Sequence, residues 1–154
     1  MNRAVLETEF ERAGDSPGLL LWQLSNTWQA KQRAALKPFG LTHVQFVLLA
    51  TLTFAVGKHT FTQKQLAEYA QTDVMMTSQV VRKLERMQLL QRNPSNLDGR
   101  AFTLRPTLAG IKLANKAIKV VEAVDRDFFA ILGDELGAFT KTMRQLVSAK
   151  KAIR

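Results

Sequence analysis

Ser78, Gln79 and Arg82 are spaced so that a helix would present all three on one face. Such side chains can read base edges, because Gln forms paired hydrogen bonds with adenine and Arg forms them with guanine. Arg86 lies one turn further along the same face. An ordinary solvated helix would carry the same residue types, so this alternative stays open. The pattern predicts a candidate surface for nucleic-acid contacts.

A second group of charged side chains, Arg92, Asp98 and Arg100, lies in and beside a stretch rich in turn-forming residues. Cations on a β-loop are suited to phosphates or to the minor groove. Arg100 is the strongest candidate for a DNA contact. The alternative is a surface ion pair with Asp98, which would contribute little stability. We expect both, with Asp98 positioning and shielding Arg100 while DNA is absent.

Weaker candidates flank these two groups. Met75 and Met76 could contact thymine methyl groups, although core or turn filling explains them equally well. Thr62, Gln63 and Thr72 stand at expected helix starts, where they could donate to phosphates. Helix capping alone would also explain both threonines.

The net charge of +9 is concentrated in the middle of the chain. Residues 58–120 hold 11 Lys and Arg against 4 Asp and Glu, whereas the segments before and after each carry an excess of one positive charge. A basic segment between nearly neutral ends is typical of a protein with a polyanionic partner. A merely solvated basic surface is the other interpretation of the charge alone.

Several classes of site find no support in the composition. The 154 residues include no cysteine, and the two histidines, His43 and His59, are not at metal-ligand spacing. Because phosphate-binding glycine loops, nucleophile elbows and paired-carboxylate motifs are also missing, we expect no enzyme, cofactor or metal site. The longest apolar run, residues 46–56, is too short for a membrane span. The N-terminus lacks a secretory signal, so we expect a cytoplasmic location.

Capping patterns and turns organise the chain as a single domain, residues 1–154. Ser16-Pro17 and the Thr-x-x-Gln patterns at Thr42 and Thr62 are typical helix starts. After residue 88 the helical spacing gives way to strand-like alternation. The expected elements are helices over about 17–37, 42–55, 62–70, 74–88, 107–132 and 136 onward, with strands over about 89–92 and 101–104.

The order of the central elements predicts a winged helix-turn-helix. A short helix and a three-residue turn precede the amphipathic helix 74–88, which is apolar on one face and polar on the other. A basic hairpin, 89–105, follows it. We therefore expect a mainly α fold with a small β-hairpin wing. In this fold the helix 74–88 enters the major groove and the wing lies along the flanking backbone.

The sequence also resembles the MarR family of bacterial regulators over roughly residues 18–150. The motifs that carry the resemblance are GLTHVQFVLLATL from Gly40, LAEYA at 66–70, VVRKLERMQLL at 80–90, DGRA at 98–101 and LRPTLAG at 104–110. The resemblance implies a homodimer with a winged lobe over about 40–105 and dimerisation helices over about 1–37 and 107–154. It further implies a pseudo-palindromic operator in double-stranded DNA, and a repressor released by a small, often aromatic or phenolic, ligand.

Two positions depart from the family pattern. Gln79 follows Ser78 where the family often has Arg or Lys, which affects the bases that are read. Gln88 stands just before the wing where the family usually has Gly, so the preceding helix is expected to end differently.

Five residues could line a ligand pocket between the dimer helices and the winged lobe, although plain core and dimer packing explains each of them. They are Trp22, Trp28, Phe39, His43 and Phe46. The alternative function is a winged-helix module that coats DNA without sequence preference or assembles proteins, with no ligand response.

Overall fold

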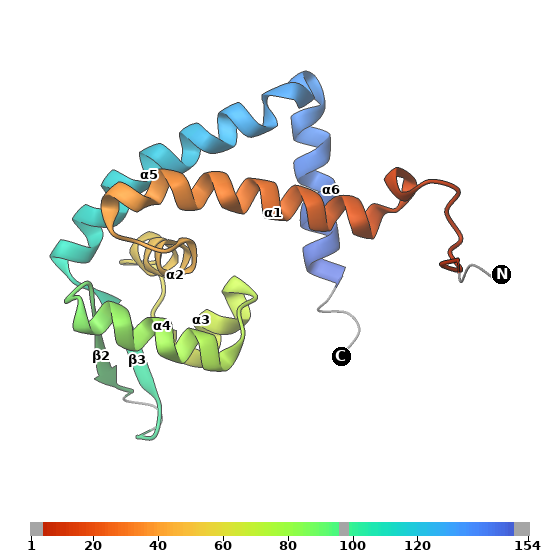
Figure 1. Cartoon of the computed structure of the whole chain (residues 1–154). Coiled ribbons are helices and arrows are strands. Elements are labelled where there is room, and N and C mark those ends of the chain that lie inside the picture. Colours follow the sequence, from red (N-terminus) through yellow and green to blue (C-terminus); the bar gives the residue numbers. More distant parts are fainter. Residues whose placement is uncertain (1–4, 96–98, 150–154) are drawn as a thin grey trace.

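The structure is a computed structural model that describes residues 5–95 and 99–149. It is mainly helical with one small sheet, as the sequence predicted (Figure 1). In chain order the elements are η1 (Ala13–Asp15), α1 (Pro17–Leu36), η2 (Lys37–Phe39), α2 (His43–Phe54), β1 (Phe61–Thr62), α3 (Gln63–Ala70), α4 (Val74–Arg86), β2 (Leu90–Pro94), β3 (Phe102–Pro106), α5 (Leu108–Phe129), η3 (Ala130–Glu135) and α6 (Leu136–Ala149).

Four polar residues start helices as their sequence context predicts. Thr42 and Thr62 form complete capping boxes, in which each hydroxyl accepts from the backbone N–H three residues on. The Gln side chain at that position accepts from the threonine N–H in return. Ser16 caps α1, and Asp73 caps α4 by accepting a hydrogen bond at 2.9 Å. The starts of α1 to α4 are therefore set by local hydrogen bonds.

The wing belongs to a three-stranded antiparallel sheet in the order β1-β3-β2. β2 pairs with the whole of β3, with Leu90 opposite Pro106 and Pro94 opposite Phe102. The expected hairpin is confirmed, but the sequence missed β1, whose two residues are too few to show an alternating pattern. The expectation that the strand ends at 104 was wrong, because at Arg105 and Pro106 β3 pairs only with β2, and a proline is tolerated at such an open edge.

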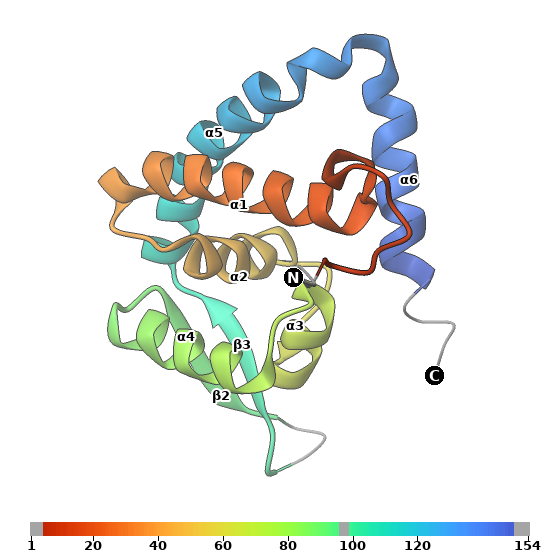
Figure 2. The same ribbon diagram turned by 45° about the vertical axis from the view of Figure 1, so that its right-hand side comes forward.

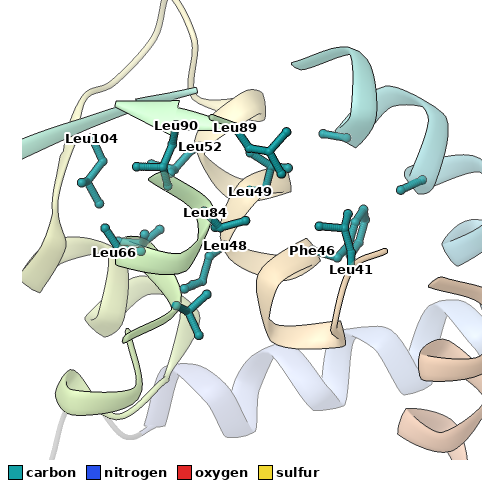
Figure 3. Close-up of a cluster of buried hydrophobic side chains, with 14 of the residues drawn as sticks. Leu41, Phe46, Leu48, Leu49, Leu52, Leu66, Leu84, Leu89, Leu90 and Leu104 are labelled. Carbon is teal, nitrogen blue, oxygen red and sulfur yellow. The ribbon is translucent and has the colours of Figure 1, made fainter. Parts of the chain in front are cut away.

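The core of the winged lobe is built from leucines of five elements. Leu48 of α2, Leu66 of α3 and Leu84 of α4 are fully buried, together with Leu90 and Leu104 of the sheet (Figure 3). Close packing of this kind fixes the orientation of each contributing element. Because one face of α4 is buried in this core, its opposite face points outward.

α1 and α5 lie side by side over the winged lobe, and α6 turns back from the far end of α5 (Figures 1 and 2). α5 ends at Phe129, three residues before the expected end at Leu132. The chain continues as η3 and bends at Gly133, which has a φ of +50°. No described residue of α6 is buried, and most of its large apolar side chains are exposed in the single chain, whereas Phe139 packs near Phe129.

No single helix in the described part of the chain is long and apolar enough to cross a membrane. The segments Pro17–Phe39 and His43–Phe54 together meet that criterion by length and composition, although they are bent by 75°. Four residues of α2 are buried in the protein core, which accounts for the apolar composition of this helix.

Candidate DNA-binding surface

The outward face of α4 carries one row of exposed residues. Met75, Gln79, Arg82 and Arg86 follow one another at intervals of four, three and four residues, which is the spacing of a single helix stripe. Ser78 is half-buried beside this row. The opposite, buried face consists of Thr77, Val80, Val81 and Leu84. The row, called here the α4 row, has the shape and polarity of a helix surface that enters a major groove.

The turn before α4 is held by a network of hydroxyl groups. The Thr72 and Thr77 hydroxyl oxygens lie 2.7 Å apart, and the Thr77 hydroxyl also donates to the Asp73 carbonyl at 2.7 Å. Since Thr77 has one hydroxyl proton, Thr72 donates to Thr77 in this arrangement. Thr72, predicted as a phosphate donor, uses its proton inside the protein. Sequence reasoning missed Thr77, whose only signal is a polar residue within an apolar stripe.

Arg92 joins the wing to α4. Its Nε donates to Glu85 Oε2 at 2.8 Å, and its guanidinium lies 5.3 Å from the centroid of the Phe102 ring. The two charged side chains are 30% and 37% exposed, so solvent screens the pair. Arg92 was predicted to contact DNA, whereas here it holds β2 against α4. Glu85 was missed because its partner lies on another element.

The remaining cations of the wing lie at its tip and on its central strand, β3. Arg100 is exposed in the turn that leads into β3. Asp98 lies outside the described residues, so its pairing with Arg100 stays a prediction. Arg105 is exposed on β3, opposite Gln91. The wing therefore presents positive charge beside the α4 row.

Thr62 and Gln63 lie at the start of α3, and both are half-buried. The Thr62 hydroxyl accepts from the Gln65 N–H at 3.2 Å, which leaves its own proton for a second partner such as a phosphate. Met76 is 40% exposed at the start of α4, and its N–H donates to the Asp73 cap.

A tight contact connects the end of α4 to the start of α5. The Thr107 hydroxyl donates to the Gln88 carbonyl at 2.7 Å, and the Thr107 N–H donates to the Leu89 carbonyl at 3.0 Å. Gly110 packs so closely here that a Cβ would overlap the Leu89 carbonyl oxygen. Gln88 itself has a φ of +59°, the left-handed conformation that glycine adopts most readily. The position of α4 is therefore coupled directly to α5.

The five predicted pocket residues do not gather in one place. The Trp28 and His43 rings are 5.0 Å apart, but Trp22 is 69% exposed on α1. Phe46 is buried in the core, and Phe39 packs against that core.

Trp28 belongs to a polar cluster between α1 and α5. Trp28 Nε1 and Gln32 Nε2 both donate to Asp125 Oδ1, at 2.7 and 2.8 Å. Burial lowers the pKa of the nearby His43 below its ordinary 6.5, the positive charge of Arg33 lowers it further, and Asp125 opposes both. The cluster ties the two helices together, while burial and Arg33 favour the neutral form of His43.

A cavity of about 900 Å³ lies elsewhere, between α2, α3 and α5. Its walls include apolar side chains such as Phe54 and Ile118, with Lys58, His59 and Tyr69 as polar lining residues. None of the five predicted pocket residues lines this cavity. Within residues 5–95 and 99–149, no group of three or more His, Asp or Glu side chains is arranged to hold a metal ion.

Comparison with known proteins identifies the family of this chain. The model of the MarR family matches residues 41–102. The chain is 42% identical over 124 residues to an uncharacterised HTH-type transcriptional regulator of Bacillus subtilis, a match that covers 80% of this chain and 84% of that protein. The chain belongs to the MarR family. It is accordingly a DNA-binding transcriptional regulator of the winged helix-turn-helix type.

Two further proteins are similar to this MarR-family chain. It is 34% identical over 121 residues to an HTH-type transcriptional repressor of Mycobacterium tuberculosis, covering 78% of this chain and 85% of the relative. Among solved structures it is similar to CouR from Rhodococcus jostii RHA1, which was determined bound to p-coumaroyl-CoA. That similarity has a TM-score of 0.78 at 20% identity over 90% of this chain and 96% of CouR, and it concerns the fold.

Proposed function

We propose that this MarR-family regulator is a homodimeric, sequence-specific repressor that a small ligand releases from DNA, acting by binding and not by catalysis. Two α4 helices would enter successive major grooves on one face of a pseudo-palindromic operator, about 34 Å apart. The observation that carries the proposal is the exposed α4 row opposite the core, with the wing held beside it by Arg92 and Glu85. Because its partner is DNA, we propose a cytoplasmic location.

The proposed dimer rests on apolar side chains that the single chain leaves exposed. Leu146 on α6 is 71% exposed and Ile131 in η3 is 92% exposed, while Leu20 and Leu24 on α1 are also exposed. Large apolar side chains exposed in such numbers on the terminal helices are typical of a protein interface. We therefore propose α1, α5 and α6 as dimerisation helices and the segment from α2 to β3 as the DNA-binding lobe.

Two observations support repression and release by a ligand. The Mycobacterium tuberculosis relative is named a repressor, and CouR has the same fold and was solved with a bound thioester ligand. The cavity between α2, α3 and α5 offers a mostly apolar site with polar groups at Lys58, His59 and Tyr69, a combination suited to a small aromatic ligand. A ligand that binds better to a dimer with a different lobe spacing would lower DNA affinity by shifting the population.

The test begins by selecting operator sequences from a random DNA library with the purified protein. Fluorescence anisotropy then compares the selected site with random DNA over a range of salt concentrations. We expect a preference for one short inverted repeat by several orders of magnitude. The variant Arg82→Ala should lose about 1–3 kcal/mol on the selected site if Arg82 reads a base. Lys141→Ala, which removes an exposed cation from the face of α6 away from Leu146, is the matched control and should bind normally.

Each contrary result identifies a different function. Equal affinity for all sequences would identify a protein that coats DNA, and the absence of DNA binding would identify a module for protein assembly. A monomer in sedimentation at working concentration would overturn the dimer. The variant Arg100→Ala should bind DNA more weakly at an unchanged melting temperature. If this variant instead fails to fold, Arg100 is a structural residue.

A further inference from the structure

The first turn of α4 exposes apolar side chains where the helix would meet DNA first. Val74, Met75 and Met76 are 60%, 71% and 40% exposed, three consecutive positions of a helix that otherwise separates apolar and polar faces cleanly. The first turn contains no acidic residue, and the carboxylate of Asp73 just before it is used as the helix cap. Leaving this apolar surface in water is unfavourable unless a partner covers it.

Met75 is the first member of the α4 row. The same row continues with Gln79, Arg82 and Arg86, so it changes from apolar at its start to cationic at its end. Since α4 enters the groove as one rigid element, both ends of the row meet the same stretch of DNA. The cationic end of the row suits a polyanion such as DNA, and the apolar start belongs to the same continuous surface.

The major groove offers one apolar group, the C5-methyl of thymine. Guanine, adenine and cytosine present only donors and acceptors there. The unbranched and flexible thioether side chain of methionine adapts easily to such a small apolar target. We propose that Met75 reads a thymine methyl group in each half-site and that Val74 extends this apolar contact. This assignment of base specificity rests on the proposed function.

The experiment replaces thymines one at a time by uracil in the selected operator, which removes only the methyl group and keeps base pairing. At the thymine that Met75 contacts, we expect affinity to fall about fourfold in one half-site and about fifteenfold in both, as the burial of one methyl per half-site implies. In the variant Met75→Ala this penalty should disappear. Gln79→Ala lies in the same row and should keep it.

The outcomes separate the inference from the function on which it rests. If no sequence is selected, the proposed function itself fails. If a sequence is selected but uracil is tolerated at every thymine, or the half-site contains no thymine, the inference is wrong and the regulator remains. Retention of the uracil penalty in Met75→Ala would also overturn it. Because Met75 is exposed, Met75→Ala should keep its melting temperature, and Met75→Leu should restore part of the penalty.

Discussion

Gln88 shows how one residue ends the recognition helix. The N–H groups of Gln88 and Leu89 donate to the carbonyls of Glu85 and Leu84, which is the hydrogen-bond pattern of a Schellman motif. The residue at the centre of this motif has to be left-handed, and here it is Gln in place of the Gly that the family usually has. The helix therefore ends on a left-handed residue as it would with glycine there, but with a conformational cost.

The variant Gln88→Gly should be more stable than the natural protein. A left-handed conformation costs a non-glycine residue about 1–2 kcal/mol, which the variant no longer loses. Against this gain, the greater freedom of glycine in the unfolded chain destabilises the folded state by about 0.4–1 kcal/mol. The net gain is about 0.5–1 kcal/mol, visible as a higher urea midpoint at an unchanged slope. Gln91→Gly, at a position without a positive φ, should lower the midpoint instead.

His43 should make the protein less stable in mild acid. Its pKa is lowered in the folded chain, chiefly by burial, from the ordinary value of 6.5. The unfolded chain therefore binds the proton more tightly, so the stability that neutral His43 contributes is complete above pH 6.5 and is lost as pH falls through the lowered pKa. Urea denaturation between about pH 7.5 and about pH 5.5 measures this loss. His43→Gln should flatten that slope, and an unchanged slope would contradict the assignment.

At the residue scale, the sequence predicts what is decided within a few positions of the chain. The capping boxes at Thr42 and Thr62 were predictable because both partners stand three residues apart. The pairing of Arg92 with Glu85 was not, because the two residues meet only when β2 folds onto α4. The position of Met75 at the head of a row follows from helical spacing, while its exposure required the packed core.

At the scale of the elements, the contact between the end of α4 and the start of α5 is closely packed at Gly110. Gly110→Ala should destabilise the protein by about 2 kcal/mol or more, because its Cβ would overlap the backbone carbonyl of Leu89, which cannot rotate away. Thermal unfolding measures the effect. The control Gly137→Ala, in α6 with no atom within 4 Å of its Cβ, should be neutral or stabilising by up to about 1 kcal/mol. Equal effects of both substitutions would mean that the close approach is absent.

At this scale the periodic elements were predictable and the short ones were not. The apolar stripe of α4 was apparent in the sequence because it repeats over thirteen residues. β1 has two residues and is defined only by its partner strand, so no local pattern could indicate it. α5 ends three residues early because the chain tightens into the 3-10 helix η3 from Ala130, before the bend at Gly133. The cavity lies between three elements, so the sequence did not locate it.

At the scale of the whole molecule, the proposed dimer would bury the apolar side chains that the single chain leaves exposed. Leu146→Glu should convert the dimer into a monomer and weaken operator binding by more than tenfold, because a carboxylate there would be buried without a partner. Analytical ultracentrifugation measures the mass. Gln145→Glu adds the same charge on a different face of α6 and should remain a dimer. A dimeric Leu146→Glu protein would place the interface elsewhere.

Because of the close approach at Gly110, a tilt of α5 would move the DNA-binding lobe with it. Thr107 and Gly110 fasten the lobe to one end of a helix of 22 residues, which is about 33 Å long. If α5 tilts by about 10° around its far end, α4 swings by about 6 Å, which is enough to leave the groove. An effector that changes the tilt of α5 would therefore move α4 out of register with the groove while the leucine core of the lobe stays packed.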